Sequence, residues 1–377
     1  MPEARDPVAD LREIAFRLER ANEASYRVRA FRSAADAVGR FSPDELAQRV
    51  ADGTLTKLPG VGEVTARCAA ESLAGEEPVY LRRLVATADV DLDAQTELLR
   101  GALRGDCHSH SDWSDGGSPI AEMALAAARL GHQYLVVTDH SPRLTVARGL
   151  SAERLRQQLD EVAALNAVLP GPAPGSTEPG FRILTGIEVD ILADGSLDQE
   201  PELLAELDVV VGSVHSRLKD ERPVMTERMI AALANPHLDI LGHCTGRTLG
   251  TKQGAGDRAH RRPVGRKESD FDPEAVFAAC VRHDKAIEVN CRPDRLDPPK
   301  RLLRQAVEAG CRFAIDTDAH APGQLDWLPY GCERAVQCGV PVERIVNTWP
   351  AELLLQWTAA HSQGPDIRVR SVRGKNR

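Results

Sequence analysis

Residues 105–117 read GDCHSHSDWSDGG, an expected strand that runs directly into a polar turn. His108 and His110 are two positions apart, so in an extended backbone both imidazoles leave the same face. Asp115 follows in a Ser-Asp-Gly-Gly turn, which lets its carboxylate bend back toward the same place. A lone His-x-His also occurs in solvated surface loops, so the rest of the chain decides between a loop and a ligand cluster.

Short apolar segments alternate with helical patterns along most of the chain. The expected strands cover 106–110, 134–138, 182–189, 209–214, 240–243, 286–290 and 312–316. The expected helices cover 120–130, 152–168, 202–207, 225–234, 273–283 and 299–309. Strands that alternate with helices form a parallel sheet, and seven such units predict a closed or nearly closed α/β barrel.

Histidines and acids stand where these expected strands end. The candidate ligands are six histidines and three acids: His108, His110, His140, His215, His243, His320, Asp115, Glu188 and Asp318. Because α/β barrels build their active sites at the C-terminal ends of the strands, we expect these side chains to converge. Unpaired carboxylates buried together would be very costly without cations to offset them. The pattern therefore predicts a metal site.

The donor types narrow the choice of metal. Nine ligands exceed what one ion needs, and mixed nitrogen and carboxylate donors without a thiolate suit Zn²⁺ or Mn²⁺. Iron is possible, whereas Ca²⁺ prefers oxygen ligands only. Cys244, beside His243, is a conceivable further ligand, although packing in the core is the commoner role.

Residues 1–90 are expected to form a separate all-α domain. Apolar residues recur there at helical spacing, at Leu11, Ile14, Ala15 and Leu18 and again at Phe31, Ala34, Ala35 and Val38. Ser42 before Pro43, with Asp44 and Glu45 next, has the pattern of a capped helix start.

Residues 55–66, LTKLPGVGEVTA, resemble a helix-hairpin-helix motif. Gly60, Val61 and Gly62 would form a tight turn whose amide groups meet a DNA phosphate at the start of the next helix. Arg29 and Arg32 of an earlier helix would add phosphate contacts. The alternative is a glycine-rich turn between two packed helices.

Composition bounds the functional classes. The chain is 42% hydrophobic and 27% charged, with a formal net charge of −9. That charge argues against binding nucleic acid over the whole surface, but it allows a local basic patch. No apolar run reaches the length of a membrane span and the N-terminus has no signal-peptide pattern, so we expect a cytoplasmic protein without membrane association. Eight cysteines without a C-x-x-C pair are expected to be reduced thiols.

Several segments complete the expected organisation. We expect a linker at 91–103, the barrel at 104–360 and a basic disordered tail at 361–377. The stretch 170–180, PGPAPGSTEPG, should be a surface excursion. The basic stretch 248–269 is either a mobile flap over the site or a solvated insertion.

With these motifs in hand, the region from about residue 104 to 357 resembles a PHP (polymerase and histidinol phosphatase) domain. The motifs are D-x-H-x-H-S at 106–111, S-D-G at 114–116, T-D-H at 138–140, G-I-E-x-D at 186–190, S-V-H at 213–215, G-H at 242–243 and D-T-D-A-H at 316–320. The resemblance implies a distorted seven-stranded barrel with three divalent ions in a cleft. It implies one ion on His108, His110, Glu188 and Asp318, a second on Glu188, His215 and His243, and a third on Asp115, His140 and His320.

The chain is further similar to bacterial family X DNA polymerases. The matching motifs are T-G-R at 245–247, R-P at 292–293, R-L-D at 295–297 and Q-L-D at 324–326, together with Y-R-V-R-A-F-R at 26–32. The nucleotidyl-transfer palm is missing, so the resemblance implies no template-directed synthesis. Cys68 stands where some members of that family have a lyase lysine, which argues against lyase activity.

The leading hypothesis is a metal-dependent phosphoesterase that acts on DNA ends as a 3′-5′ exonuclease or 3′-phosphatase. Glu188 and Asp318 are the expected catalytic residues. Arg247 is expected either to clamp a phosphate or to form a salt bridge on the barrel rim. Asp139 and Asp316 are expected to orient ligand histidines. The alternatives are a phosphatase for a small phosphomonoester, of histidinol-phosphate or nucleotide type, and a DNA-repair adaptor with a structural metal site.

Overall fold

A computed structural model describes residues 5–88, 92–169, 180–250 and 265–362. The chain divides into two compact units, residues 1–91 with 322–324 and residues 92–321 with 325–377. The expected excursion at 170–180, most of the basic stretch 248–269 and almost all of the tail fall outside the described residues.

The N-terminal unit is all-α. Its helices are α1 (Pro7–Arg20), α2 (Ser25–Val38), α3 (Pro43–Ala51), α4 (Glu63–Leu73) and α5 (Val79–Ala88), with a 3₁₀ turn at Leu55–Lys57. The apolar stripes predicted on α1 and α2 form one buried cluster, in which Leu11, Ile14 and Phe31 are at most 4% exposed. Burial of these stripes holds short helices that would be marginal in isolation.

The predicted start of α3 is confirmed. The Ser42 hydroxyl accepts from the Glu45 amide at 3.4 Å, and the Glu45 carboxylate accepts from the Ser42 amide at 2.8 Å. This reciprocal pair satisfies two amide groups that the first helical turn would otherwise leave without a partner.

The second unit is a barrel of seven parallel strands, as predicted. Its strands are β1 (Gly105–Ser109), β2 (Tyr134–Val137), β3 (Arg182–Asp190), β4 (Val209–Ser213), β5 (Ile240–Leu241), β6 (Ala286–Asn290) and β7 (Arg312–Asp316). They pair in sequence order from β1 to β7. The register of β1 against β2 shifts between Asp106 and Ser109.

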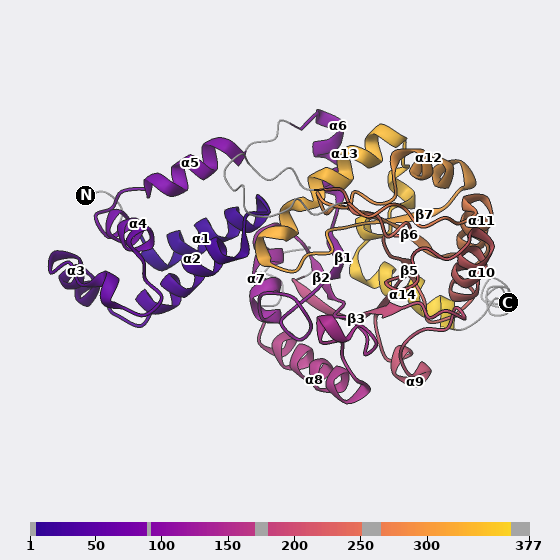
Figure 1. Cartoon of the computed structure of the whole chain (residues 1–377), viewed down its shortest axis with the longest axis horizontal. Coiled ribbons are helices and arrows are strands. Elements are labelled where there is room, and N and C mark those ends of the chain that lie inside the picture. The colour runs from indigo at the N-terminus through magenta and orange to yellow at the C-terminus, as the bar shows by residue number, and fades with distance from the viewer. Residues whose placement is uncertain (1–4, 89–91, 170–179, 251–264, 363–377) are drawn as a thin grey trace, which may run out of the picture. The chain divides into compact units, whose positions relative to one another are not determined.

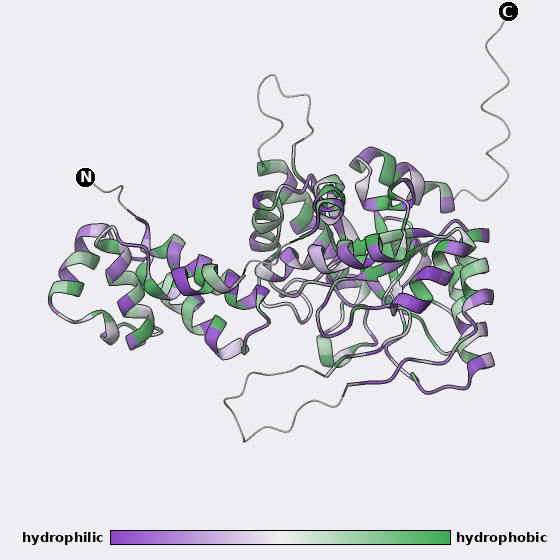
Figure 2. Ribbon diagram, turned by 90° about the horizontal axis from the view of Figure 1, so that it is seen from above, coloured by the Kyte–Doolittle hydropathy of each residue, from purple (hydrophilic) through white to green (hydrophobic). Residues whose placement is uncertain are grey.

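Helices cover the outside of this barrel (Figure 1). They are α6 (Ala94–Ala102), α7 (Ile120–Arg129), α8 (Ala152–Val168), α9 (Pro201–Leu204), α10 (Arg222–Leu233), α11 (Pro273–Arg282), α12 (Lys300–Ala309) and α13 (Leu328–Cys338), whereas α14 (Ala351–Ser362) packs on the inner core. Further 3₁₀ turns lie at Thr145–Ala147, Pro322–Trp327, Val342–Arg344 and Val346–Thr348. Hydrophobic and hydrophilic residues alternate around the outer helices in Figure 2, as expected of helices with one face on a sheet.

One expected boundary differs from the structure. Residues 91–103, taken from the sequence as a linker, contain α6, and this helix belongs to the barrel unit and packs on α13. The Asp93 carboxylate caps α6 by accepting from the amides of Gln95 and Thr96 at 3.0 Å, and Leu99 is buried. The two leucines of this short helix are adjacent, and only Leu99 of the two is buried, so no periodic signal is found in the sequence.

The two faces of the strands build two different cores. Inward-facing positions form a cluster closed at one end by α14, and it includes Tyr134, Val136, Leu184, Val209, Val211, Ile240, Ala286, Ala314, Leu354 and Trp357. Outward-facing positions such as Val210, Ile287 and Phe313 pack against the outer helices. Strands of a barrel are thus buried on both faces, which explains why they read as continuous apolar runs.

Hydrogen bonds from side chains join β1 to β7, and we call this junction of the first and last strands the seam. The Asp316 carboxylate accepts from the Cys107 amide at 2.8 Å, and Asp106 accepts from the Thr317 amide at 3.2 Å. The Asn347 amide donates to the Gly105 carbonyl at 3.0 Å and to the Ile315 carbonyl at 2.6 Å. Beyond the strand ends, Ser109 pairs with Ala319. Polar side chains therefore substitute for part of a regular hydrogen-bonded ladder at this seam.

All eight cysteines lie in the described part of the chain, where each is buried as a free thiol. Burial raises the pKa of Cys68 to about 11, so this thiol stays protonated at neutral pH. None of the described helices is long and apolar enough to cross a bilayer.

The buried imidazole of His132, just after α7, should make stability depend on pH. Burial and the nearby Arg100 lower its pKa from 6.5 to about 3, and among the described residues neither ring nitrogen has a hydrogen-bond partner. The unfolded chain therefore binds a proton more readily than the folded chain, and stability falls as pH decreases from about 6.5 toward about 3. At pH 5 this group should cost about 2 kcal/mol relative to neutral pH.

The variant His132→Leu should remove that cost. Urea unfolding of metal-free protein at pH 7.5 and pH 5.0 gives the free energy of unfolding of both proteins. We expect the variant to gain about 2 kcal/mol on wild type between the two pH values. The other histidines titrate alike in both proteins, so a difference that is independent of pH would contradict the assignment.

Candidate metal centre

Side chains alternate between the two faces of each strand. This alternation places apolar residues in the inner core and directs polar groups into one end of the barrel. On four strands the inward series leads into candidate ligands or their partners. The series are Tyr134 and Val136 on β2, followed by Thr138 and His140 just past its end; Leu184, Gly186 and Glu188 on β3; Val209, Val211 and Ser213 on β4, followed by His215; and Ala314 and Asp316 on β7, followed by Asp318. Side chains two apart share a face of a strand, so a short apolar run determines where the polar residue after it points.

Glu188 lies at the centre of the candidate ligands. Its carboxylate oxygens are 2.8 Å from His140 Nδ1, 2.9 Å from His243 Nε2 and 3.3 Å from His215 Nε2. His108 Nε2 and His110 Nε2 are 3.4 and 3.6 Å from it. Five imidazoles therefore surround one buried carboxylate.

Eight of the nine candidate ligands fall into three overlapping groups, and within each group the donor atoms lie within 4.8 Å of one another. The groups are His108, His110 and Asp318; His140, Glu188 and His215; and His110, Asp115, His140 and His320. They resemble the three ligand sets expected from the sequence, but His110 and His140 also lie between groups. His243 joins through its contact with Glu188 rather than through a group of its own.

Buried polar atoms in this cluster have the positions and chemistry that a divalent ion requires. Among the described residues, several make no well-aligned hydrogen bond although they are shielded from solvent, and the groups nearest to them are other candidate ligands: His108 Nε2, both ring nitrogens of His110, His140 Nδ1, His243 Nδ1 and Glu188 Oε2. Buried polar groups without partners are costly, and nitrogen and carboxylate donors are what Zn²⁺ and Mn²⁺ prefer. The residues present fit a metal site.

Electrostatics within the cluster favour charged acids. Burial would raise the pKa of Glu188, but His215, His108 and His140 hold it well below its usual range. Burial likewise opposes ionisation of Asp318, yet Arg292 and His108 keep its pKa well below the ordinary value. Burial lowers the pKa of His110 well below 6.5, which leaves its imidazole neutral and able to bind metal.

Two acids behind the histidines were missed in the sequence. Glu288 on β6 lies 2.6 Å from His108 Nδ1, and Asp190 at the end of β3 lies 2.6 Å from His215 Nδ1. Both carboxylates orient a ring so that Nε2 faces Glu188. An acid inside the apolar strand AIEVN was a signal for Glu288, and Asp190 stands in the quoted G-I-E-x-D motif.

The acids expected to orient histidines do something else. Asp139 accepts from the hydroxyl groups of Ser111 and Ser114 and from the side-chain amide of Gln158 at 2.6 Å. It therefore holds the loop that carries Asp115. Asp316 binds the Cys107 amide at the seam. The prediction for both residues was wrong, because their carboxylates are used by the backbone and hydroxyls of neighbouring segments.

Arg247 lies on the barrel rim, which agrees with the alternative prediction of a salt bridge there rather than a phosphate clamp. Its guanidinium donates to the carbonyls of Arg295, at 3.0 Å, and Leu296, and lies 3.7 Å from Glu268. The cations beside the ligands are instead Arg295, whose Nε is 3.3 Å from Asp318 Oδ2, and Arg292, whose Nη1 is 3.6 Å from Asp318 Oδ1. Arg295 Nη1 is buried and, within the described chain, has no hydrogen-bond partner.

In the N-terminal unit, two of the hairpin amide groups already have hydrogen-bond partners. The Val61 amide donates to the Leu58 carbonyl at 3.1 Å, and the Gly62 amide donates to Thr65 Oγ1 at 3.0 Å. Gly60 has φ +87°, and an added Cβ would lie 3.2 Å from Ser33, so glycine permits the close approach to α2.

The two arginines predicted to contact DNA differ. Arg32 pairs with Glu19 at 2.7 Å, whereas Arg29 is exposed to solvent. Residues 1–91 carry 13 lysines and arginines against 16 aspartates and glutamates, which gives no general attraction for phosphates. Contact of the hairpin and these arginines with DNA stays a prediction.

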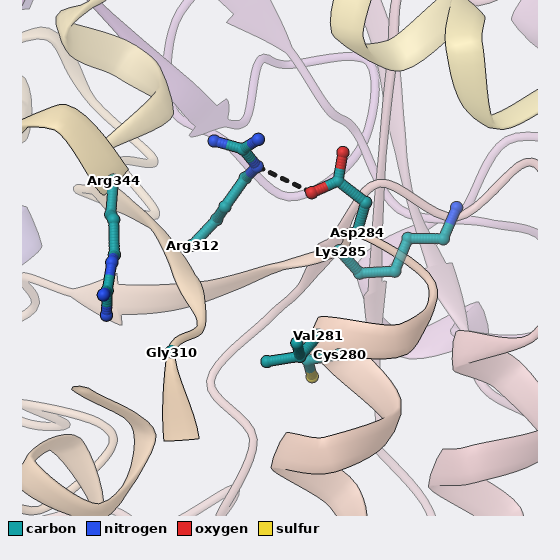
Figure 3. Close-up of a pocket in the computed structure, with 7 residues that line it drawn as sticks. All are labelled: Cys280, Val281, Asp284, Lys285, Gly310, Arg312 and Arg344. Carbon is teal, nitrogen blue, oxygen red and sulfur yellow. Dashed lines mark hydrogen bonds and ion pairs between the residues drawn. The ribbon is translucent and has the colours of Figure 1, made fainter. Parts of the chain in front are cut away.

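A separate hollow of about 210 Å³ lies at the ends of β6 and β7 opposite to the ligands (Figure 3). Arg312 crosses it to pair with Asp284 at 2.7 Å, and Arg344 donates to the Val307 carbonyl at 3.1 Å. Arg344 thus binds a carbonyl at the end of a helix, and Arg312 forms a local ion pair.

Comparison with known proteins identifies the two parts. Residues 106–290 match the PHP domain family, and residues 3–77 match a helix-hairpin-helix domain. The barrel is a PHP domain. The resemblance found in the sequence motifs is thereby confirmed, and with it the fold class.

Several relatives share the PHP barrel. The DNA polymerase/3′-5′ exonuclease PolX of Bacillus subtilis is 38% identical over 247 residues, which cover 66% of this chain and 39% of that protein. This chain therefore spans about two fifths of the length of that relative. A probable phosphatase of Thermoanaerobacter is 26% identical over 254 residues, covering 64% of this chain and 89% of the relative. The names of these two relatives, an exonuclease and a probable phosphatase, both describe hydrolases.

One solved structure is also similar to this chain. The histidinol phosphate phosphatase of Lactococcus lactis, complexed with zinc, L-histidinol and phosphate, has a TM-score of 0.39 and 16% sequence identity, covering 62% of this chain and 92% of that one.

Proposed function

We propose that this chain is a metal-dependent phosphoesterase that hydrolyses phosphate esters at DNA ends, as a 3′-5′ exonuclease or 3′-phosphatase. The observation that carries the proposal is the set of three overlapping ligand groups around Glu188. A single ion would leave several of these buried donors without a partner, whereas three divalent ions would use them all. The donor set fits Zn²⁺ and Mn²⁺, with iron possible.

Different residues of this chain would hold the three ions. His108, His110 and Asp318 would hold one ion, Glu188 with His215 and His243 a second, and Asp115, His140 and His320 a third. Bound divalent ions supply an activated water and neutralise charge on phosphate. Glu188 keeps five imidazoles oriented, and Glu288 and Asp190 fix the rings of His108 and His215.

Arg295 is the residue best placed to bind the substrate phosphate. Its Nε is 3.3 Å from Asp318, and its buried Nη1 still has a donor to offer. A guanidinium can pair with two phosphate oxygens at once and can stabilise charge that grows during in-line attack. Arg247 supports the backbone of Arg295 through its carbonyl and so acts on this cation indirectly.

Two observations bear on the substrate. The helix-hairpin-helix domain and the PolX relative, which is named as an exonuclease, favour DNA. The probable phosphatase, matched over 89% of its own length, favours a small phosphomonoester as the second candidate. Both substrates present the same phosphate ester to the ions, so the metal centre alone does not choose between them.

A direct comparison of substrates tests the proposal. The full chain, loaded with Mn²⁺ or Zn²⁺, is assayed on a 3′-phosphorylated oligonucleotide, on 3′-labelled DNA, on histidinol phosphate and on p-nitrophenyl phosphate. We expect kcat/KM on a DNA end to exceed that on the small esters. A preference for histidinol phosphate would instead establish the second candidate. No turnover with either metal would leave only the adaptor with a structural site.

Removal of the Arg295 guanidinium should weaken phosphate binding. We expect Arg295→Ala to lower kcat/KM on p-nitrophenyl phosphate by about 10²-fold, because a buried charged donor to the reacting group is lost. Arg247→Ala should cost less than tenfold, since its guanidinium reaches backbone carbonyls rather than the ligands. Arg301→Ala, which breaks only an exposed pair with Glu268, is the matched control. A larger loss for Arg247→Ala than for Arg295→Ala would restore Arg247 as the phosphate clamp.

A further inference from the structure

A second hollow, of about 350 Å³, lies at the same end of the barrel as the candidate ligands, and we call it the Tyr330 hollow. It is lined by six residues from the segments that follow the C-terminal ends of β5, β6 and β7: Arg247, Leu296, Lys300, Tyr330, Glu333 and Arg334. This is the side on which α/β barrels bind their substrates. A volume above about 300 Å³ is enough for a small organic ligand.

One chain segment separates the Tyr330 hollow from the metal centre. On the side of the metal centre, the Asn290 side-chain amide is 3.1 Å from Asp318 Oδ2, and Arg295 Nε is 3.3 Å from the same oxygen. On the side of the hollow, Arg247 donates to the Arg295 carbonyl at 3.0 Å. The residue after Arg295, Leu296, lines the hollow. The two sites therefore share this segment as a common wall.

Two guanidinium groups in the Tyr330 hollow are poorly neutralised. Arg334 is only 5% exposed, and it donates to backbone carbonyls rather than to an acid. Arg247 also donates to carbonyls, and it has an acid, Glu268, at 3.7 Å. Burial and the positive charge of Arg247 lower the pKa of Arg334, although the buried Asp297 offsets part of this repulsion. An anion in the hollow would relieve the repulsion between the two cations.

The other lining residues add one more cation and an aromatic wall. Lys300 is exposed and donates to the Gln337 side chain, whose amide group donates to Glu333 at 2.8 Å. The one acid of the hollow thus has a partner, and three cations line the hollow with it. Tyr330 packs against the outer core and is partly exposed. An aromatic ring beside several cations is how proteins hold single-stranded nucleic acid, with the base on the ring and the phosphate on the cations.

We propose that the Tyr330 hollow is a nucleotide subsite, in which the ring of Tyr330 stacks on a base and the cations of the hollow hold its phosphate. The nucleotide would be the neighbour of the one whose ester lies at the metal centre, because the common wall places the hollow directly beside Arg295. The subsite rests on the proposed function and deepens it. It gives the barrel a preference of its own for a nucleic-acid strand over a small phosphomonoester.

Ligand binding to the metal-free chain tests the subsite without turnover. Thymidine 5′-monophosphate and inorganic phosphate are each titrated by calorimetry into full-length protein freed of metal, so that no ion can hold either ligand. We expect the nucleotide to bind at least about tenfold more tightly than phosphate. Tyr330→Ala should lower the affinity for the nucleotide by about 5- to 100-fold, whereas Tyr330→Phe, which keeps the ring, should retain most of it.

Turnover of p-nitrophenyl esters connects the hollow to the substrate. The chain loaded with Mn²⁺ is assayed on p-nitrophenyl phosphate and on the p-nitrophenyl esters of thymidine 5′- and 3′-phosphate, which place a nucleoside on either side of the ester. On one of the two thymidine esters, Tyr330→Ala should raise KM by about tenfold more than on p-nitrophenyl phosphate. Lys300→Ala should raise the same KM. Arg304→Ala, which removes an exposed cation of α12 outside the hollow, is the matched control and should change neither constant.

The outcomes separate the subsite from the proposed function. Equal affinities for thymidine 5′-monophosphate and phosphate, both unaffected by Tyr330→Ala, would overturn the subsite and leave the phosphoesterase. An equal rise of KM on all three esters would show that Tyr330 acts through the fold or the metal centre, and would also overturn it. Retained nucleotide binding in a chain without turnover would overturn the proposed function instead. Circular dichroism establishes that each variant is folded, and Lys300→Ala replaces Tyr330→Ala if the latter does not fold.

Discussion

Glu188→Gln should lose at least about 10³-fold in kcat on p-nitrophenyl phosphate. The carboxylate lies within 3.6 Å of five imidazole groups and is shared between ligand groups, so its charge is needed at more than one ion position. The amide has nearly the same volume but carries no charge and presents only one oxygen. We therefore expect weaker metal binding together with loss of turnover, measured by steady-state kinetics and by elemental analysis of the same sample.

The fold should tolerate this substitution. Glu188 contacts side chains of the site rather than the apolar core, so metal-free Glu188→Gln should melt within a few degrees of metal-free wild type. Glu202→Gln, an exposed acid at the start of α9, is the control and should keep wild-type turnover. A Glu188→Gln enzyme with wild-type kcat would show that this carboxylate does not bridge the ions, and a large loss of stability would make the kinetic result uninformative for Glu188.

Exhaustive chelation should abolish turnover and lower the melting temperature. Histidine nitrogens and carboxylates that an ion would pair are left facing one another in its absence, several of them buried without hydrogen bonds. An ion that binds only the folded state at 100 times its Kd stabilises that state by about 2.7 kcal/mol. We expect the melting temperature to rise as Zn²⁺ or Mn²⁺ is restored, in step with the return of activity.

Magnesium provides the comparison for this experiment. Mg²⁺ prefers oxygen ligands and keeps much of its water, so it should restore less of the stability lost on chelation than Zn²⁺ or Mn²⁺. Differential scanning fluorimetry with each metal at equal free concentration measures this order. Turnover that persists after complete chelation would exclude a metal-dependent mechanism.

The nine candidate ligands could be found from the sequence because each is governed by a local rule. Alternation along a strand is a property of the backbone. Val209 and Val211 face the inside of the barrel, so His215, an even number of positions further on, is expected to face the same way. The C-terminal ends of parallel strands meet at one face, which brings Glu188 and Asp318 together although 130 positions separate them in the chain. The fold class follows from the same alternation of strands and helices.

Only the tertiary structure decided which groups stand behind the ligands. His108 meets Glu288 across 180 positions, and Arg247 reaches the Arg295 carbonyl across 48. The carboxylate of Asp139 accepts hydrogen bonds from Ser111 and Ser114 rather than from a histidine. Such pairings depend on the register between strands and on the paths of the loops that follow them, which no local period encodes. The period-two pattern therefore specifies the face on which a residue lies, and closure of the barrel specifies its partner.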